Sequence, residues 1–196
     1  MGIPSKKSDE KYSYADYLKW PDEERWELID GIPYNMSPVP STEHQRISRD
    51  IEVQFANYLR GKSCEVFDAP FDVRLSRGNE NDEEIKTVVQ PDIVIICDKN
   101  KLDKRGCKGA PDLVAEIISH ATAKKDMQEK FLLYERSGVK EYWLVFPLDK
   151  AIDVYILNEN NKYERSGLYQ YPDNDKVEVG IFPDLEIDLA WVFGEG

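Results

Sequence analysis

Two acidic residues in the middle of the chain stand in or beside almost continuously apolar segments. Asp92 begins the run 92–97 (DIVIIC), and Glu116 lies inside the run 113–118 (LVAEII). Such runs are typical of central strands covered on both faces, where an ionised carboxylate is costly unless it has a partner. Adjacent strands lie about 4.8 Å apart, so these two carboxylates are close enough to bind one Mg²⁺ or Mn²⁺. We therefore expect them within about 6 Å of each other.

Other readings of these acids have to be weighed. Glu116 alone would serve equally well as a cap for a neighbouring helix or as the partner of a buried lysine. Asp112 also lies in a Pro-Asp pair, but it is four residues from Glu116 on one strand, about 13 Å away. That separation is too large for a shared ion. With only His44 and His120 in the chain, a three-histidine zinc site is excluded.

The elements that must position these acids follow from periodicity and capping residues. An amphipathic helix over about 121–137 and a third apolar run, 141–146, follow Glu116. The expected order, listed along the chain, is helix 14–20, hairpin 26–36, helix 41–60 capped by Ser41, strand 67–75, strands 92–97 and 113–118, helix 121–137, strand 141–146, hairpin 152–165, extended segment 182–188 and a short helix near Trp191. This order predicts an α/β (α+β) fold with a mixed central sheet and flanking helices.

Composition limits the functional classes. The 196 residues are 41% hydrophobic and 33% charged, which predicts one globular domain over 1–196 with a flexible segment 1–10. A net charge of −12 excludes binding through an all-basic surface but leaves a local basic patch possible. No apolar run approaches the ~20 residues of a membrane span, and no secretory signal is visible. No CxxC pair is present among the three cysteines, Cys64, Cys97 and Cys107. We therefore expect a protein of the reducing cytoplasm, in which these cysteines are small buried hydrophobic residues.

The spacing of the two acids resembles a known signature. Pro91-Asp92 followed by Ala115-Glu116 resembles the PD-(D/E)XK nuclease motif, and the whole chain more closely resembles the Uma2 (DUF820) family of restriction-endonuclease-like proteins. The matching pieces are 14–18 (YADYL), 27–31 (ELIDG), His44-Gln45, 89–92 (VQPD), 109–114 (GAPDLV), 116–119 (EIIS), Thr122-Ala123, Asp126, Lys130, Tyr134, 141–143 (EYW) and 182–183 (FP).

The resemblance implies a restriction-endonuclease-like core and metal-dependent phosphodiester hydrolysis, with Asp92 and Glu116 holding Mg²⁺ or Mn²⁺. The nuclease motif places a lysine two residues after the glutamate, where this chain has Ile118. Uma2-like proteins carry a lysine on the following helix, which implies a catalytic role for Lys130.

Helical phase is consistent with that lysine. At 3.6 residues per turn, Lys130 lies at the edge of an inward stripe that includes Met127, Lys124 lies at the opposite border, and Lys125 points to solvent. The position of Lys130 fits two other interpretations equally well. Its side chain would either extend along apolar surface with the ammonium in water, or form a salt bridge with Asp126.

Several supporting residues are weaker candidates. Glu27 is either a third acid of the site, as the resemblance implies, or an exposed hairpin acid. His44 and Gln45 lie in the first turn of a helix, where an anion is favoured, although a plain surface position fits as well. Lys124 and the basic loop at 99–108, with Lys101, Lys104 and Arg105, are candidate phosphate contacts or simply solvated residues.

The favoured interpretation is a metal-dependent DNA endonuclease acting on double-stranded DNA, working as a homodimer in the cytoplasm. A non-catalytic nucleic-acid or protein interaction module that retains the fold is the alternative, favoured by Ile118 and by the negative charge. A phosphodiesterase or RNase acting on another substrate would use the same residues.

Overall fold

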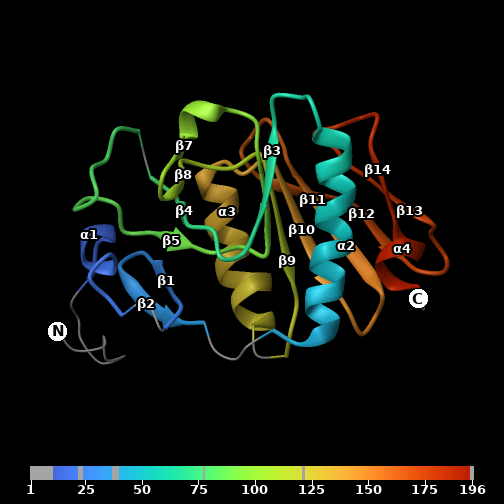
Figure 1. Cartoon of the computed structure of the whole chain (residues 1–196), viewed down its shortest axis with the longest axis horizontal. Helices are drawn as coiled ribbons and strands as arrows, with labels where there is room; N and C mark the ends of the chain where they lie inside the picture. Colours follow the sequence, from blue (N-terminus) through green and yellow to red (C-terminus); the bar gives the residue numbers. More distant parts are fainter. Residues whose placement is uncertain (1–10, 22–23, 37–39, 77, 121, 195–196) are drawn as a thin grey trace.

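The structure is a computed structural model that describes residues 11–21, 24–36, 40–76, 78–120 and 122–194 (Figure 1). The segment 1–10, for which the sequence predicts flexibility, lies outside this part. The strands are β1 (Trp26–Ile29), β2 (Ile32–Asn35), β3 (Glu65–Asp68), β4 (Val73–Arg74), β5 (Val88–Val89), β6 (Ile93–Ile96), β7 (Leu102–Asp103), β8 (Gly106–Lys108), β9 (Leu113–Ile117), β10 (Glu141–Phe146), β11 (Ala151–Leu157), β12 (Tyr163–Gln170), β13 (Lys176–Glu178) and β14 (Glu186–Asp188). The helices are α1 (Tyr14–Tyr17), α2 (Thr42–Leu59), the 3₁₀ helix η1 (Lys99–Lys101), the π-helix η2 (Lys125–Lys130), α3 (Phe131–Ser137) and α4 (Leu189–Phe193).

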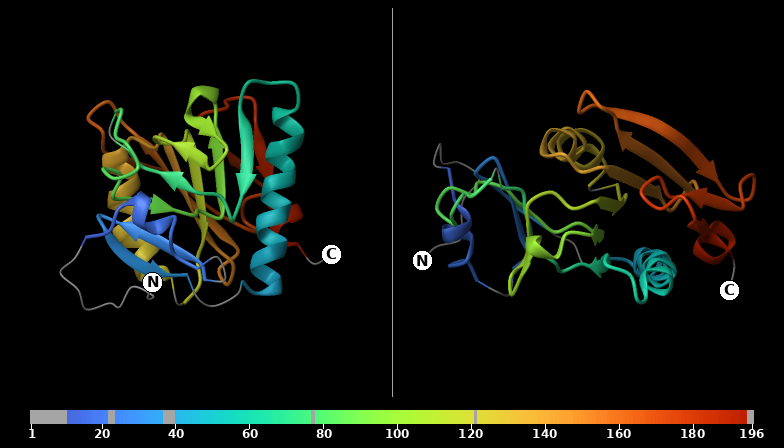
Figure 2. Two further views of the ribbon diagram at one scale, coloured as in Figure 1. Left: turned by 60° about the vertical axis from the view of Figure 1, so that its left-hand side comes forward. Right: turned by 90° about the horizontal axis from the view of Figure 1, so that it is seen from above.

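The central sheet has the strand order β12-β11-β10-β9-β6-β3. Strands β9 and β10 are parallel and the other neighbours are antiparallel, so the sheet is mixed, as predicted. Helix α2 covers one face and α3 the other (Figure 2). Because side chains alternate along a strand, Ile93 and Ile95 of β6 pack toward α2, whereas Val94 and Ile96 pack toward α3.

A second sheet, in the order β2-β1-β5-β4-β8-β7, lies beside the central one (Figure 2). Strand β5 passes through Gln90 and Pro91 directly into β6, so the two sheets meet next to Asp92. Strand β1 is an inner strand, paired with both β2 and β5, and all four of its residues are buried. Glu27 is therefore brought to the junction of the sheets.

One predicted element is wrong. The sequence predicts a single strand over 67–75, but β3 belongs to the central sheet and β4 to the second one. The chain crosses between them at Pro70, and proline has no N–H with which to continue a strand ladder. Alternation of apolar residues continues across the break, which is why the pattern alone does not reveal it.

Among the described residues, no helix is both long and apolar enough to cross a membrane.

The helix α2 begins after Ser41, as the sequence predicts. The hydroxyl oxygen of Ser41 accepts a hydrogen bond from the N–H of His44.

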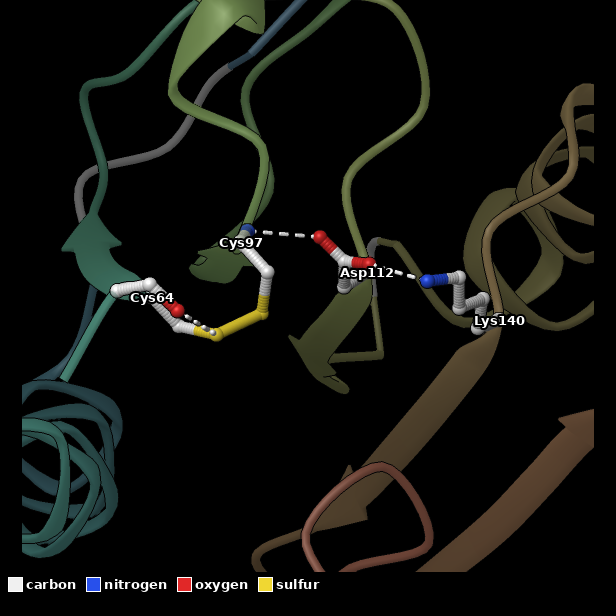
Figure 3. The surroundings of a disulfide bond; sticks show 5 residues. Cys64, Cys97, Asp112 and Lys140 are labelled. Carbon is white, nitrogen blue, oxygen red and sulfur yellow. Dashed lines mark hydrogen bonds and ion pairs between the residues drawn. A yellow bond between two sulfur atoms is a disulfide. The ribbon is translucent and has the colours of Figure 1, made fainter.

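The cysteines differ from the prediction. Cys64 and Cys97 form a disulfide (Figure 3), and Cys107 alone is a free buried thiol. Glu65 pairs with Ile96 across β3 and β6, so the same antiparallel register brings Cys64 opposite Cys97 one step further out. Disulfides are rare in reducing compartments, and the prediction of a cytoplasmic location therefore no longer has reduced cysteines as support.

Reducing this disulfide is expected to lower the free energy of unfolding by about 3–4 kcal/mol, because the disulfide closes a long loop in the unfolded chain. The two cysteines are 33 residues apart in sequence. Urea unfolding with and without dithiothreitol measures the difference. A Cys64→Ser variant is the control: it should match the reduced protein and be insensitive to the reductant. An unfolding midpoint that does not change on reduction would contradict the assignment.

Candidate active site

Asp92 and Glu116 lie on neighbouring strands of the central sheet, on the face that α3 covers. Ile93 pairs with Ala115 across β6 and β9, and one step further this antiparallel register sets Asp92 opposite Glu116. Directly opposed residues have Cβ atoms about 4.5–5.5 Å apart. Oδ2 of Asp92 accepts a hydrogen bond of 2.7 Å from the N–H of Ile117, which ties this carboxylate to β9 beside Glu116.

Asp112 lies at the other end of β9 and has a different role. Oδ2 accepts a hydrogen bond of 2.8 Å from the N–H of Cys97, and Oδ1 accepts one of 2.7 Å from Lys140 (Figure 3). Asp112 therefore stabilises the end of the sheet that carries the disulfide, and it is separate from the Asp92 and Glu116 pair.

The helix after β9 brings a lysine to Glu116. The Lys130 side chain is 2% exposed, and its Nζ lies 2.8 Å from Oε1 of Glu116, 2.7 Å from Oε1 of Glu27 and 3.6 Å from Oδ1 of Asp126. The hydroxyl of Tyr134, one turn further along, also donates to Oε1 of Glu116, at 2.7 Å. Lys130 thus fills the position toward the sheet that the helical pattern predicts.

The orientation of two other residues on this helix was predicted wrongly. Met127 was expected to point inward but is 46% exposed, and Lys125 was expected to face solvent but donates to Oε2 of Glu27 at 2.6 Å. The cause is the π-helical segment η2, in which residues five apart replace residues four apart as hydrogen-bonded neighbours. Lys125 and Lys130 are five apart and consequently share one face.

Glu27 is fully buried, so the interpretation as an exposed hairpin acid is wrong. Two ammonium groups contact it, Lys125 at Oε2 and Lys130 at Oε1. The N–H of Gln90 also donates to Oε1, at 3.1 Å. Glu27 therefore holds both lysines of η2 next to the junction of the sheets.

The two buried glutamates differ in their electrostatics. Burial raises the pKa of Glu116 to about 8, with the negative charges of Asp126, Asp92 and Glu27 adding to the rise and Lys130 opposing it. Burial acts in the same direction on Glu27, but Lys130 and Lys125 together outweigh it and lower its pKa. For Lys130, burial disfavours the charged form, yet the three surrounding carboxylates raise its pKa well above the usual value. The cluster therefore keeps an ammonium at Lys130 and favours a proton, or another cation, at Glu116.

This asymmetry predicts a pH-dependent stability for the metal-free protein. An acid whose pKa is higher in the folded than in the unfolded state destabilises the fold as pH rises from its unfolded pKa toward its folded one. The free energy of unfolding of the wild type should thus fall, relative to that of a Glu116→Gln variant, as the pH rises from 4.5 to about 8. The upper limit of this loss is about 1.4 kcal/mol for each unit by which the folded and unfolded pKa values differ. Urea unfolding at several pH values in EDTA measures both proteins. Parallel curves for the two proteins would show that Glu116 does not titrate in this range.

A pocket of about 610 Å³ opens over this cluster. Its lining residues come from the start of α2 and the end of β9, among other segments. Its lining includes Asp92, Glu116, Lys125 and Lys130. His44 also lines it, with Nε2 3.2 Å from Oδ2 of Asp92. Its Nδ1 is buried and has no hydrogen-bond partner among the described residues. The structure thus brings His44 together with the acids and lysines that the sequence singles out.

The other predicted phosphate contacts lie outside this pocket. Gln45 and Lys124 are exposed on α2 and at the start of the helix that follows β9. Strand β6 leads from Asp92 to the basic loop, which consequently lies at the opposite end of the sheet (Figure 1). In that loop Lys101 donates to the carbonyl of Ala110 at 2.7 Å, Arg105 pairs with Asp82 at 2.7 Å, and Lys104 is exposed.

Sequence reasoning left four residues of the site without a role, namely Gln90, Lys125, Asp126 and Tyr134. Asp126 is buried, and its Oδ1 lies 3.6 Å from Nζ of Lys130. This is the salt bridge that the sequence analysis gave as an alternative role for Lys130. Gln90 receives two hydrogen bonds from Arg25 and donates to Asp72, so it anchors the crossing between the sheets. The sequence did carry signals for Asp126 and Tyr134, which belong to the pieces that match the family, whereas the five-residue spacing of Lys125 and Lys130 does not by itself indicate a shared face.

The carboxylate pair fits Mg²⁺ or Mn²⁺ better than a metal that needs a complete protein cage. Within the described ranges, no group of three or more His, Cys, Asp or Glu side chains is arranged to hold a metal. Mg²⁺ is usually bound through one or two carboxylates, with waters and substrate phosphates completing the octahedron. Lys130 and Tyr134 both donate to Oε1 of Glu116, which leaves Oε2 as the oxygen available to a cation beside Asp92.

Comparison with known proteins identifies the family and the fold of this chain. The family model for Uma2, with the description "Putative restriction endonuclease", matches residues 14–190, which confirms the resemblance. The uncharacterized protein slr1290 from Synechocystis sp. (strain ATCC 27184 / PCC 6803 / Kazusa) is 27% identical over 172 residues, covering 86% of this chain and 85% of the relative. The crystal structure of a "putative nuclease belonging to DUF820" from Anabaena variabilis ATCC 29413 has a TM-score of 0.68 at 20% identity, covering 92% of this chain and 97% of that one. At that identity the likeness shows the fold alone.

Proposed function

The chain belongs to the Uma2 family, whose description is "Putative restriction endonuclease", and we propose that it is a divalent-metal-dependent endonuclease of the PD-(D/E)XK type that hydrolyses DNA. The observation that carries the proposal is the placement of Lys130 on Glu116, with Asp92 opposite Glu116 across β6 and β9, in one pocket. These are the chemical groups of the nuclease motif, which takes its glutamate and its lysine from one strand, whereas here the lysine comes from a helix.

The residues of the pocket have different roles in this proposal. Asp92 and Glu116 would hold Mg²⁺ or Mn²⁺, and such an ion polarises a phosphate and lowers the pKa of a water. Lys130 orients Glu116 and places positive charge where negative charge develops on the phosphate during hydrolysis. Glu27 keeps Lys130 and Lys125 in place. His44, 3.2 Å from Asp92, orients that carboxylate.

Nucleic acid that extends beyond the scissile phosphate would meet residues outside the pocket. Gln45 and Lys124 are exposed near it, and Lys101, Lys104 and Arg105 at the far end of β6 are reached only by a longer or curved substrate. These five residues stay predicted phosphate contacts. The single domain, the homodimer and the cytoplasmic location likewise stay predictions; sedimentation analysis tests the dimer.

The test is cleavage of plasmid DNA and of labelled oligonucleotides by the purified protein in Mg²⁺ or Mn²⁺, with EDTA as the control. We expect cleavage that requires the ion, together with binding of Mn²⁺ measured by calorimetry. A protein that binds no Mn²⁺ and cleaves no nucleic acid would overturn the proposal.

A non-catalytic binding module is the second candidate, and one observation favours it. Ile118 occupies the motif's lysine position, and Lys130 is held by three carboxylates with almost no exposure. A module of this kind would bind oligonucleotides in EDTA as well as in Mn²⁺ and leave them intact. The same cleavage and binding measurements therefore separate the two candidates.

A further inference from the structure

The pocket over the carboxylates continues onto a wall of apolar side chains. Ile118 and Met127 contribute from the segment after β9, and Phe146, Pro147 and Leu148 from the end of β10 and the turn that follows it. The same pocket is therefore lined by the acids and by a group of apolar side chains, called the apolar wall below.

Two side chains of this wall are largely exposed to solvent and contribute little to the packing of the core. Leu148 is 76% exposed, the most of any large hydrophobic side chain in the described part of the chain, and Met127 is 46% exposed. Large exposed apolar side chains gathered at a pocket mark a ligand surface. The turn 147–150 does not need leucine at this position for folding, because its side chain is mostly in solvent.

The polar lining of the same pocket indicates what kind of ligand this is. Arg25, His44 and Lys125 place cationic or hydrogen-bonding groups near the carboxylates. Arg25 also binds Gln90 and Lys125 also binds Glu27, so a phosphate would share these groups with their present partners. Among ligands that join a phosphate to an apolar group, a nucleotide is the one that fits the nuclease function proposed above.

The base of a nucleotide within a regular duplex is stacked on its neighbours and cannot reach such a wall. Enzymes that need contact with a base act on single strands or take the base out of the stack. Single strands are characteristically bound by stacking on aromatic side chains, and Phe146 is the aromatic member of this wall. We propose, on the basis of the nuclease function proposed above, that the apolar wall binds an unstacked nucleobase beside the scissile phosphate. The preferred substrate is then single-stranded or locally unpaired nucleic acid.

The charge of the chain points the same way. A protein that follows a long duplex must neutralise many phosphates, but this chain carries a net charge of −12 and has its basic loop at the far end of β6. Contact with one or two nucleotides needs few cations when stacking supplies affinity. The sequence analysis predicts a duplex substrate, and the present proposal departs from that prediction.

The inference is tested by binding of short fluorescent oligonucleotides to the wild type in Ca²⁺, followed by fluorescence anisotropy. Three probes are compared: a single-stranded hexamer, its duplex, and a hexamer of abasic nucleotides that keeps the phosphates without the bases. We expect the single strand to bind more tightly than either of the others, by between about fivefold and a hundredfold over the abasic strand.

Leu148→Ser removes the wall's most exposed side chain with little risk to folding, and Phe146→Ala removes its aromatic ring. Both should weaken binding of the single strand and leave the abasic strand unaffected, because the mutation and the loss of the base remove the same contact. Leu168→Ser is the matched control, since Leu168 is 47% exposed on β12 and does not line the pocket. It should bind all three probes as the wild type does.

Two results would overturn the inference: equal affinity of the wild type for the normal and abasic strands, or binding and Mn²⁺-dependent cleavage of the duplex at least as good as those of the single strand. In both cases Mn²⁺-dependent cleavage would still support the nuclease function. Absence of Mn²⁺ binding and of cleavage of any probe would instead remove the nuclease function and the inference with it.

Discussion

Alanine in place of Asp92 or Glu116 is expected to abolish metal-dependent cleavage while the protein stays folded. Loss of a residue that only supports a metal ligand usually costs 10- to 100-fold, so removal of a ligand itself should reduce the rate by more than about 100-fold. The remaining carboxylate can hold the ion only weakly, because the pocket offers no further acid in a suitable position within the described residues.

Stability distinguishes this outcome from simple unfolding. Glu116→Ala removes one of three acids around Lys130, and the ammonium still has Glu27 at 2.7 Å and Asp126 at 3.6 Å. The raised pKa of Glu116 indicates that its ionised form is unfavourable in the fold. The variant should consequently unfold at the same urea concentration as the wild type or a higher one at pH 8.

Matched substitutions at Asp112 provide the control for this experiment. Asp112 belongs to the same strand as Glu116 but contacts Cys97 and Lys140 at its other end. Asp112→Asn should affect stability and leave cleavage in Mn²⁺ unchanged per folded molecule. Undiminished cleavage by both Asp92→Ala and Glu116→Ala would contradict the assignment of the carboxylate pair.

The carboxylate pair was predictable because its signal is local. Asp92 and Glu116 interrupt apolar runs that have the length and composition of buried strands, and the alternation of side chains assigns both to one face. The antiparallel register of β6 and β9 then brings them opposite each other. The strands at 141–146 and 113–118 and the cap at Ser41 were predictable for the same reason, since each depends on a few adjacent residues.

The remainder of the site depends on contacts between distant segments. Glu27 is 98 residues from Lys125 in sequence, and nothing near it in the chain reveals that β1 is an inner strand. Lys125 was misplaced because a 3.6-residue period assumes a regular helix, whereas η2 is a π-helix. The disulfide between Cys64 and Cys97 likewise depends on the register of β3 and β6 and not on any cysteine motif.

The second large effect is expected at Lys130. Lys130→Ala should lower the rate of cleavage by about 10²-fold or more, the scale seen when one preorganised charge is removed from a transition state. It should also destabilise the protein, because Glu27, Glu116 and Asp126 would share a buried region without their common cation. Removing one partner of a buried ion pair typically costs about 3–5 kcal/mol.

Since Lys130→Ala combines both effects, other substitutions must separate them. Lys130→Arg keeps a positive charge among the three acids and should fold, but a planar guanidinium does not reproduce a compact ammonium. It is therefore expected to recover most of the stability and only part of the rate. Lys124→Ala changes an exposed lysine just before the same helical segment, and it should leave stability unchanged and lower the rate only mildly.

Lys125→Ala decides whether the two lysines of η2 are equivalent. Lys125 contacts Glu27 alone, at 2.6 Å, whereas Lys130 contacts Glu27 and Glu116. If Lys125 only secures Glu27, its removal should reduce the rate much less than removal of Lys130, because Lys130 keeps its contact with Glu116. Single-turnover cleavage rates in saturating Mn²⁺, measured beside urea unfolding for each variant, give both quantities. Should Lys130→Ala cleave at the wild-type rate, the ammonium would have a structural role, and the non-catalytic binding module would become the better description of this fold.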